Sequence, residues 1–548
     1  MRRLSVVLGI LVLSGCASST VQQVPAKEIL VLTDGKIFTS DRANLWAEAI
    51  AIEEDRIVAV GSSQAVMAEA NRRSPLLEVH PLGGRVVVPG FNDAHYHGGT
   101  YPQHVALKFS EQDPAIDEVV AKLREAVTAN PAGTWILGDV GGRVLNDSTF
   151  DRARLDAISA THPISLTSWA GHGTVANSPA LTAFGYDDGT ADLMGGILGR
   201  TADGKLNGRL DEYAGYRAAR IFAGLVPEAD RVARYQAVTP ILAARGITSV
   251  QNMSNVNPAP EAAATIAASA SPLRWRVIRF PMTSATSFGA GEEIAAPLPG
   301  VRPGVKWILD GTPVERGAAM TVPYAGVSTT GTLNFSRQTI AAMLEDADGR
   351  GEQPMFHAVG DAAIDAMLDA MDATGGAARW KPKRVRLEHG DMATAAQLVR
   401  MRDLGVVYVQ NPSHISLVEM MRERYAPRAD VAQPVKSILA AGVPLAIGSD
   451  GPTNPFLNIM FVTLHPVTPT EALTREEAVI AYTLGSAYAE FAENEKGTLT
   501  PGKLADLAVL DADPFTVPPD QLPKIRSVLT MVGGKVVYGE LFGVATNQ

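Results

Sequence analysis

The sequence predicts an α/β protein built around a parallel (β/α)8 TIM barrel. Strand-like runs alternate with Ala-rich helical stretches through the middle of the chain, and short hairpin-like runs occupy both ends. One long stretch after the first run interrupts the alternation. These observations predict a barrel, a small β-sandwich formed from both chain ends, and an insertion after the first barrel strand. A doubly wound sheet is the alternative, but no Gly-rich phosphate-binding fingerprint follows the first strand.

The first 15 residues are expected to be a signal peptide and not part of the fold. Arg2 and Arg3 precede an apolar run over residues 4–13, and the sequence Leu-Ser-Gly-Cys follows at residues 13–16. The segment resembles a bacterial lipoprotein signal with its lipobox, which implies lipidation of Cys16. A plain signal peptide with an incidental cysteine is the alternative. Cys16 is the only cysteine, which excludes intramolecular disulfides.

Residues 16–28 are mostly small and polar, and they predict a tether between the lipid and the folded part. No later apolar stretch is long enough to span a bilayer. Ala17, which follows the cysteine, is not acidic, so nothing favours retention in the inner membrane. We therefore expect a protein that is anchored by its lipid to the bacterial outer membrane and faces the periplasm.

Length and composition favour a globular protein of more than one domain. The chain has 548 residues, of which 46% are hydrophobic and 19% charged, and this is enough apolar material for a large core. The formal net charge is -10 and no dense cluster of Lys and Arg occurs, so we expect no nucleic-acid partner. Association into an oligomer stays open.

Residues 29–85 and 497–548 are expected to form one composite β-sandwich. Short apolar runs separated by Asp-Gly and Glu-Asp turns follow residue 29, and similar runs occupy 505–515 and 527–539. Neither end has enough strands to enclose a core alone, so we expect the strands of the two ends to form one domain together.

The barrel is expected over residues 86–496. Eight runs have the length and composition of buried strands, and Ala-rich segments such as 361–373 and 393–405 have those of helices. Residues 98–244 are too long for one connection and contain strand-like runs of their own, so we expect an inserted subdomain over the barrel mouth. The eight predicted strands are 86–91, 246–252, 274–280, 304–311, 354–360, 384–390, 406–412 and 444–451.

Residues typical of metal ligands lie in or after these runs. The first run leads into a His-x-His pair, His95 and His97, whose side chains point to the same side of an extended backbone. In a barrel, functional groups gather at the carboxyl ends of the strands. Neutral imidazoles and carboxylates suit zinc and its neighbours in the first transition row. The later runs add Lys306, His357, His389 and Asp450.

The order of these residues resembles the metal-dependent amidohydrolase superfamily, and more closely its YtcJ-like (amidohydrolase 3) branch. The resemblance covers essentially everything after the tether. It implies the barrel and the sandwich, together with one or two divalent metal ions, of which zinc is expected. The motifs that carry it include PGFNDAHYH (89–97), GHGTVANSPAL (171–181), HAVGDAAID (357–365), RLEHG (386–390) and IGSDGP (447–452).

The resemblance also implies how a metal would be held. His95 and His97 would bind one metal, and His357 and His389 would bind the second. Lys306, carboxylated by CO₂, would bridge the two. The alternative for Lys306 is a packed lysine whose amine pairs with Asp310, and the alternative for His357 and His389 is a pair of ordinary core histidines.

Three residues are expected to act on the substrate. Asp450 would complete the metal shell and serve as a base and then as an acid, because a metal lowers the pKa of its bound water enough to supply hydroxide. His172 would polarise the carbonyl oxygen, or would only cap a loop. His414 would contact the substrate, or would lie on the surface.

These roles predict an amidohydrolase that cleaves a C–N bond in an amide or a cyclic amide. The same site would also suit an ester or lactone hydrolase or a deaminase. A catalytically inactive binding lipoprotein is the alternative of a different class. The expected partners are a small amide-type molecule and, through the lipid, a membrane.

Two departures from the branch pattern bear on the substrate. The chain has GDVGG at 138–142, where the branch often has Gly-Trp-Asp, and it has Gln251 and Asn252 where a His-Asp pair is common. We expect both positions to line the substrate pocket, and the metal ligands to be unaffected.

Overall fold

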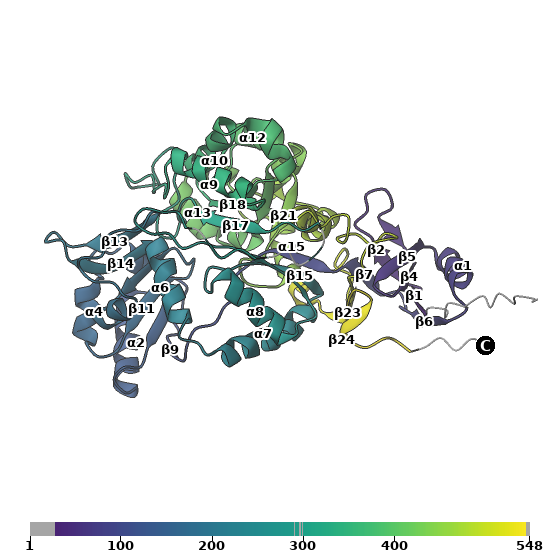
Figure 1. The fold of residues 1–548 in the computed structure, drawn as a ribbon, viewed down its shortest axis with the longest axis horizontal. Coiled ribbons are helices and arrows are strands. Elements are labelled where there is room, and N and C mark those ends of the chain that lie inside the picture. The colour runs from purple at the N-terminus through teal and green to yellow at the C-terminus, as the bar shows by residue number, and fades with distance from the viewer. Residues whose placement is uncertain (1–27, 290, 295–297, 299, 544–548) are drawn as a thin grey trace, which may run out of the picture.

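The computed structural model describes residues 28–289, 291–294, 298 and 300–543 (Figure 1). Cys16 and the signal-like segment lie outside the described residues. Within the described part of the chain, no helix has the length and apolar character needed to cross a membrane.

Eight parallel strands form a TIM-barrel-like arrangement in the middle of the molecule. They belong to two hydrogen-bonded sheets, ordered β16-β15-β8 and β17-β18-β19-β20-β21. A parallel bridge between Arg279 and Val305 joins the sheets at one seam. At the other seam the Asp450 N–H donates to the His95 carbonyl at 2.8 Å. The strands are β8 (Phe91–Tyr96), β15 (Ile247–Met253), β16 (Arg274–Ile278), β17 (Gly304–Ile308), β18 (Gln353–Ala358), β19 (Arg386–His389), β20 (Val407–Gln410) and β21 (Leu445–Ile447).

Helices cover the outside of these strands. The two Ala-rich segments form α10 (Asp361–Ala373) and α12 (Ala395–Leu404). A capping box between Thr394 and Gln397 starts α12, and Gly405 in a left-handed conformation ends it. One large core joins strands and helices and includes Trp307, Phe356, Ile364 and Met401. Other outer helices are α7 (Glu228–Ala243), α8 (Ala259–Ser269), α9 (Arg337–Gly349), α13 (Val418–Tyr425) and α15 (Pro455–Leu464).

The first barrel strand begins later than the sequence predicts. Residues Val86–Pro89 form β7, which pairs with strands from the chain ends, whereas β8 starts at Phe91 and pairs with β15. The chain changes sheets within one residue, since the Gly90 N–H donates to Asp506 and the Phe91 N–H donates to Gly246. A Cβ on Gly90 would lie 2.2 Å from the Thr248 side chain, so only glycine allows this close crossing. The prediction failed here because the sequence does not show that the strands before and after the Pro-Gly pair join different sheets.

Strands from both chain ends form two further sheets that pack together. Their shared core contains Ile50 and Ile57 from one sheet and Val87, Leu507 and Leu529 from the other. The first sheet is β5-β4-β1-β6 and the second is β24-β23-β22-β7-β2-β3. The strands are β1 (Ile29–Thr33), β2 (Lys36–Phe38), β3 (Trp46–Ala47), β4 (Ala49–Glu53), β5 (Arg56–Gly61), β6 (Leu77–Pro81), β22 (Leu507–Leu510), β23 (Ser527–Val532) and β24 (Lys535–Gly539).

The long stretch after β8 forms a sheet of its own, ordered β13-β14-β12-β11-β10-β9. It lies at the opposite end of the molecule from the chain-end sheets, with the barrel between them (Figure 1). Two separate cores form around it. Its elements include β9 (Val105–Ala106), α2 (Ile116–Ala129), β10 (Ile136–Val140), α4 (Arg152–Ile158), β11 (Ile164–Ser168), β12 (Gly173–Ala176), β13 (Gly196–Arg200), β14 (Leu206–Glu212) and α6 (Tyr213–Ala223).

Candidate metal centre

A cavity of about 660 Å³ opens at the carboxyl ends of the barrel strands. Its wall combines apolar side chains, such as Trp169, Phe280 and Met421, with a cluster of ionisable groups. This mixture is typical of sites for small molecules. The ionisable residues that line it include His97, His172, Lys306, His357, His389, Asp391, His414 and Asp450.

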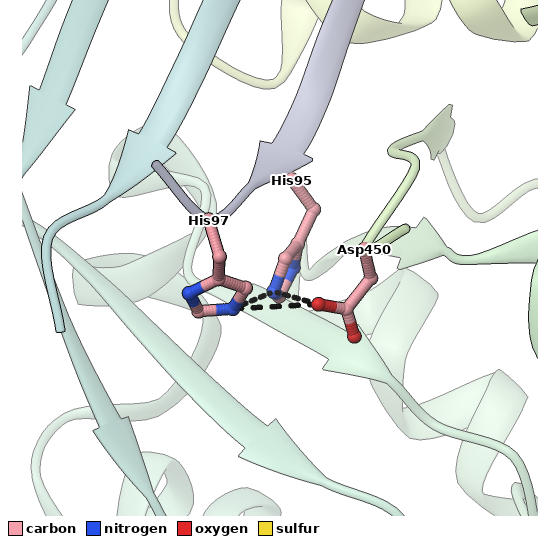
Figure 2. Close-up of side chains that lie close together, drawn as sticks. All are labelled: His95, His97 and Asp450. Carbon is pink, nitrogen blue, oxygen red and sulfur yellow. Dashed lines mark hydrogen bonds and ion pairs between the residues drawn. The ribbon is translucent and has the colours of Figure 1, made fainter. Parts of the chain in front are cut away.

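His95, His97 and Asp450 converge at one side of this cavity (Figure 2). The Nε2 atoms of the two histidines are 3.3 Å apart, and Asp450 Oδ1 lies 3.8 Å from the first and 3.4 Å from the second. The end of β21 passes directly over His95, because Gly448 has no Cβ; a Cβ there would lie 2.3 Å from that of His95. The two strand ends therefore hold three ligand-type atoms within reach of one ion.

Buried charges fix the orientation of His95. Glu388 Oε2 lies 2.6 Å from His95 Nδ1, and the Arg386 guanidinium donates to both oxygens of Glu388. Burial opposes the ionisation of Glu388, but Arg386 and His95 overcome this and hold the pKa of Glu388 at about 2. The Glu388 carboxylate therefore accepts from Nδ1–H, which leaves the Nε2 lone pair of His95 directed at the site.

Lys306 is fully buried beside His95, with Nζ 2.9 Å from His95 Nε2. Burial lowers the pKa of Lys306 to about 8. The alternative pairing with Asp310 is not what the structure shows. Asp310 instead accepts hydrogen bonds from the backbone N–H groups of Ala319, Val359 and Gly360.

A second group of ligand-type atoms shares Asp450 with the first. Asp450 Oδ2 lies 3.7 Å from His389 Nδ1 and 3.7 Å from His414 Nε2. Asp391 Oδ2 lies 3.0 Å from His414 Nδ1 and orients that ring. Burial lowers the pKa of His414, but Asp391 and Asp450 outweigh it and raise the pKa to about 10.

His357 lies next to this second group without being one of its three members. Its ring centre is 4.5 Å from that of His389, and its Nε2 is 3.6 Å from Asp310 Oδ1. Burial lowers the pKa of His357 well below its usual value. His414 thus lies within reach of Asp450 and His389, and His357 lies beside His389 as a neutral ring, so the assignment of His357 as a ligand stays a prediction.

His172 reaches the cavity from the inserted subdomain. Its ring centre lies 4.5 Å from that of His357, its Nδ1 lies 3.0 Å from Glu212 Oε2, and the Tyr216 hydroxyl lies 3.1 Å from the same nitrogen. Burial lowers the pKa of His172 to about 4. Burial and the neighbouring Glu315 carboxylate raise the pKa of Glu212. His172 is therefore a neutral, positioned side chain and not a loop cap.

The donor set fits a divalent transition metal. Among the described residues, two sets of three ligand-type atoms lie within 4.8 Å of one another, and both consist of two imidazoles and one carboxylate. His389 Nδ1 is buried and has no hydrogen-bond partner in the described part of the chain. Burial lowers the pKa of His95 and His389, which keeps both rings in the neutral form that binds a metal.

Several residues of the site were not anticipated from the sequence. Glu388 lies in the RLEHG motif, two residues after Arg386 on the same strand. Their side chains therefore point to the same side, and this spacing could have identified the pair. No sequence pattern identifies Asp391, Glu212 or Asn255, because each contacts a site histidine from a loop or a strand end. They can be identified only after the chain has folded.

The expectation for Gln251 and Asn252 was wrong. Gln251 is buried and bonds to Arg386 and to the Ser486 carbonyl, and Asn252 accepts from the Gly98 N–H at 2.8 Å. Neither residue lines the cavity of the candidate metal centre. They stabilise the strands from which the candidate metal ligands extend.

Several curated proteins are similar in sequence along nearly the whole chain. The protein named LONG AFTER FAR-RED 3 of Arabidopsis thaliana is 28% identical and aligns over 93% of this chain and 91% of its own. The N-substituted formamide deformylase of Arthrobacter pascens is 27% identical, over 93% and 98%. The putative amidohydrolase YtcJ of Bacillus subtilis (strain 168) is 25% identical, over 92% and 98%.

Solved structures show the same TIM-barrel-like fold. An uncharacterized metal-dependent hydrolase from Pyrococcus horikoshii OT3 superposes with a TM-score of 0.67 at 22% identity, over 90% of this chain and 99% of the other. The atrazine chlorohydrolase TrzN from Arthrobacter aurescens TC1, complexed with zinc, gives 0.51 at 16%, over 94% and 97%. A family profile matches residues 78–538, most of the chain, and so the protein belongs to the Amidohydrolase family.

Proposed function

We propose that this protein is a metal-dependent hydrolase that cleaves the C–N bond of a small amide or cyclic amide. The observation that carries the proposal is the convergence of His95, His97, His389, His414 and Asp450 at the mouth of the barrel. Family membership supports hydrolysis, and the name of the Arthrobacter pascens relative, a formamide deformylase, supports a C–N bond.

His95, His97 and Asp450 would hold one divalent ion and the neutral rings of His357 and His389 a second, and zinc fits the donors best. When bound, such an ion supplies Lewis acidity and a water of lowered pKa. Lys306 is the residue that a carbamate would require. Its lowered pKa leaves more of the amine uncharged than in an exposed lysine, and the uncharged amine is the form that reacts with CO₂.

The residues of the chain would move the protons. Burial opposes the ionisation of Asp450, but the surrounding histidines, His95 and His414 foremost, hold its pKa well below the usual value. Asp450 is thus ionised and would accept the proton of the attacking water, then deliver it to the departing nitrogen. His172, held by Glu212, would donate to the carbonyl oxygen as negative charge develops there.

A metal analysis paired with a substrate screen tests the proposal. Protein purified without chelator should contain one or two equivalents of a divalent metal and should hydrolyse some members of a panel of N-acyl amides and cyclic amides. The double variant His95→Ala/His97→Ala should lose most of the metal and the activity. His80→Gln, in the distant strand β6, is the matched control and should keep both. A metal-loaded wild type inactive on every amide but active on esters would contradict the C–N assignment.

A further inference from the structure

A second cavity, of about 300 Å³, lies in the inserted subdomain. Helix α6 forms one wall and the sheet of β10, β11 and β12 forms the opposite one. Both walls belong to the part of the molecule that extends away from the barrel (Figure 1). This cavity is separate from the cluster of metal-ligand candidates.

The cavity exists because small residues face a polar stretch of sheet. Helix α6 presents Ala218 and Ala219 towards it, and neither side chain is large enough to fill the gap. The sheet presents the hydroxyl groups of Ser165, Thr167 and Thr174. A purely structural packing of helix on sheet would bury apolar side chains at these positions. The hydroxyl-lined floor instead suits a polar ligand.

Aromatic side chains close one end of the cavity. Phe222 stacks on Tyr101, with ring centres 5.7 Å apart and planes 22° apart, and it also packs against Trp135 at 4.3 Å. Tyr101, Phe184 and Phe222 all line the cavity. Aromatic faces attract apolar groups and cations alike.

Asp139 supplies the only carboxylate among the described residues that line this cavity, and no Lys or Arg lines it. It stands in the GDVGG segment, where the sequence departs from the branch pattern. Asp139 is an exposed residue whose partial burial raises its pKa, with His104 as the neighbouring group that opposes the rise. His104 also lines the cavity, but its Nδ1 contacts the Pro102 carbonyl, so the Asp139 carboxylate is open to a cationic group of a ligand.

The two cavities share part of their walls. Tyr101, Gly171, Tyr216 and Asn255 line both of them. Asn255 Oδ1 lies 2.9 Å from His97 Nδ1, so one shared residue contacts a candidate metal ligand directly. The two cavities therefore adjoin at Asn255 and Tyr216, next to His97.

We propose that the second cavity binds the distal part of the substrate, and that this part carries a positive charge next to an apolar or aromatic group. Asp139 would pair with the charge, the aromatic end would cover the apolar part, and the scissile amide would lie in the first cavity. This inference rests on the proposed function for the scissile bond. The binding of the distal group itself requires no turnover.

Binding measurements with a small probe test the site apart from catalysis. Isothermal titration of the full-length protein with 2-phenylethylammonium should show saturable binding, while the neutral analogue 2-phenylethanol should bind at least about tenfold more weakly, because a charge-assisted hydrogen bond contributes more than a tenfold change in Kd requires. Asp139→Asn should remove this difference. Asp203→Asn, in the exposed turn after β13, changes the net charge equally and should preserve it.

A cavity-filling variant locates the probe. Ala219→Leu, on a face of α6 that lines the cavity, should abolish binding while the melting temperature stays near that of the wild type. The double variant His95→Ala/His97→Ala should still bind the probe, which separates this site from the metal centre. Equal binding of both probes, no binding of either, or unchanged binding by Ala219→Leu would each overturn the proposal.

Steady-state kinetics tests whether binding in the second cavity contributes to the hydrolysis of a substrate. For two N-acyl amides that differ only in a terminal ammonium or hydroxyl group, the wild type should prefer the ammonium compound in kcat/KM by at least about tenfold. Asp139→Asn should lose that preference. If no amide is hydrolysed while the probe still binds through Asp139, the proposed function fails and the binding site stands. If both amides are hydrolysed equally well, the distal-group proposal fails and the hydrolase stands.

Discussion

Three residues of the candidate metal centre adopt left-handed backbone conformations that side chains usually avoid. His389 has a φ of 73°, Asp450 has 45° and Glu212 has 52°. Such a conformation in a residue other than glycine costs on the order of 1–3 kcal/mol, and it persists where the surrounding fold requires it. Each residue ends a strand or follows one; His389 and Asp450 line the cavity, and Glu212 contacts His172, which also lines it. The strain is evidence that these positions serve the site.

The substitution Asp450→Asn tests the proposed proton transfer at the level of a single residue. Asp450→Asn keeps the shape and one oxygen ligand, but the amide cannot accept a proton from water at neutral pH. We expect kcat to fall by roughly 10²–10⁴-fold, the usual contribution of a general acid–base group, while KM changes much less. The metal content of the purified variant should stay near that of the wild type. Near-normal kcat in a folded, metal-loaded variant would refute the proton-transfer role.

The sequence predicted the residue types of the site better than their grouping. His95, His97, Lys306, His389 and Asp450 lie close together, because each stands within or just after a recognisable strand. The position of His414 beside Asp450 could not be predicted, because it depends on backbone turns after β19 and β20 that no spacing in the sequence encodes.

At the scale of single elements, strand β19 carries a candidate metal ligand and the residues that orient another one. Arg386 and Glu388 lie two residues apart on the strand, and Arg386 holds Glu388, which bonds to the His95 ring. His389 ends the strand and lines the cavity. One strand therefore serves both groups of ligand-type atoms. Boundaries of such elements were harder to predict. The Pro-Gly pair at 89–90 marks a break in the run at 86–96, but nothing in the sequence shows that the strands on its two sides join different sheets.

The support given by β19 can be tested with Glu388→Gln. Loss of the carboxylate that orients a metal-binding histidine typically costs 10–100-fold in metal affinity. We expect a loss in that range, measured by competition with a chelator of known affinity. Glu352→Gln is the matched control, because Glu352 forms a similar buried ion pair with Arg279 but contacts no site histidine. Equal losses in both variants would show a general effect of destabilisation.

At the scale of the whole molecule, the buried histidines make stability depend on pH. The pKa of His172 falls from 6.5 to about 4 on folding, chiefly through burial. The unfolded chain thus binds a proton that the native protein excludes between these values, so native stability falls as pH drops below 6.5. His95, His357 and His389 act in the same direction. His414, with a raised pKa, acts oppositely, and its contribution is lost as pH rises towards about 10.

Urea unfolding of the chelated protein at pH 7 and pH 5 measures this effect. The buried carboxyl groups of Asp93, Asp310 and Glu212 have raised pKa values and act oppositely, so the contribution of His172 is isolated by comparing a variant with the wild type. His172→Gln should lose about 2 kcal/mol less between the two pH values than the wild type, because one such histidine contributes about 1.4 kcal/mol per pH unit within its window. The same pH dependence in variant and wild type would mean that His172 is not buried as a neutral ring.

The lipid anchor is a prediction about the whole molecule that rests on the sequence alone. Cys16→Ser should give a protein that incorporates no labelled fatty acid and keeps its signal segment uncleaved, because only a thiol can take the diacylglycerol and the cleavage depends on the lipid. The wild type should fractionate with the outer membrane. A wild type found in the soluble pool would show that the segment is a plain signal peptide.

The passage from β7 to β8 through Gly90 has a consequence for the order in which the protein can fold. Strand β7 lies between β2 and β22, and residues near position 89 pair with residues near position 507. A chain that emerges from its N-terminus during synthesis or export cannot complete this sheet until its last strands arrive. The contact order of the sheet is therefore very high, which predicts slow acquisition of structure. Until then its early strands present unpaired edges, which would make a holding chaperone useful during export.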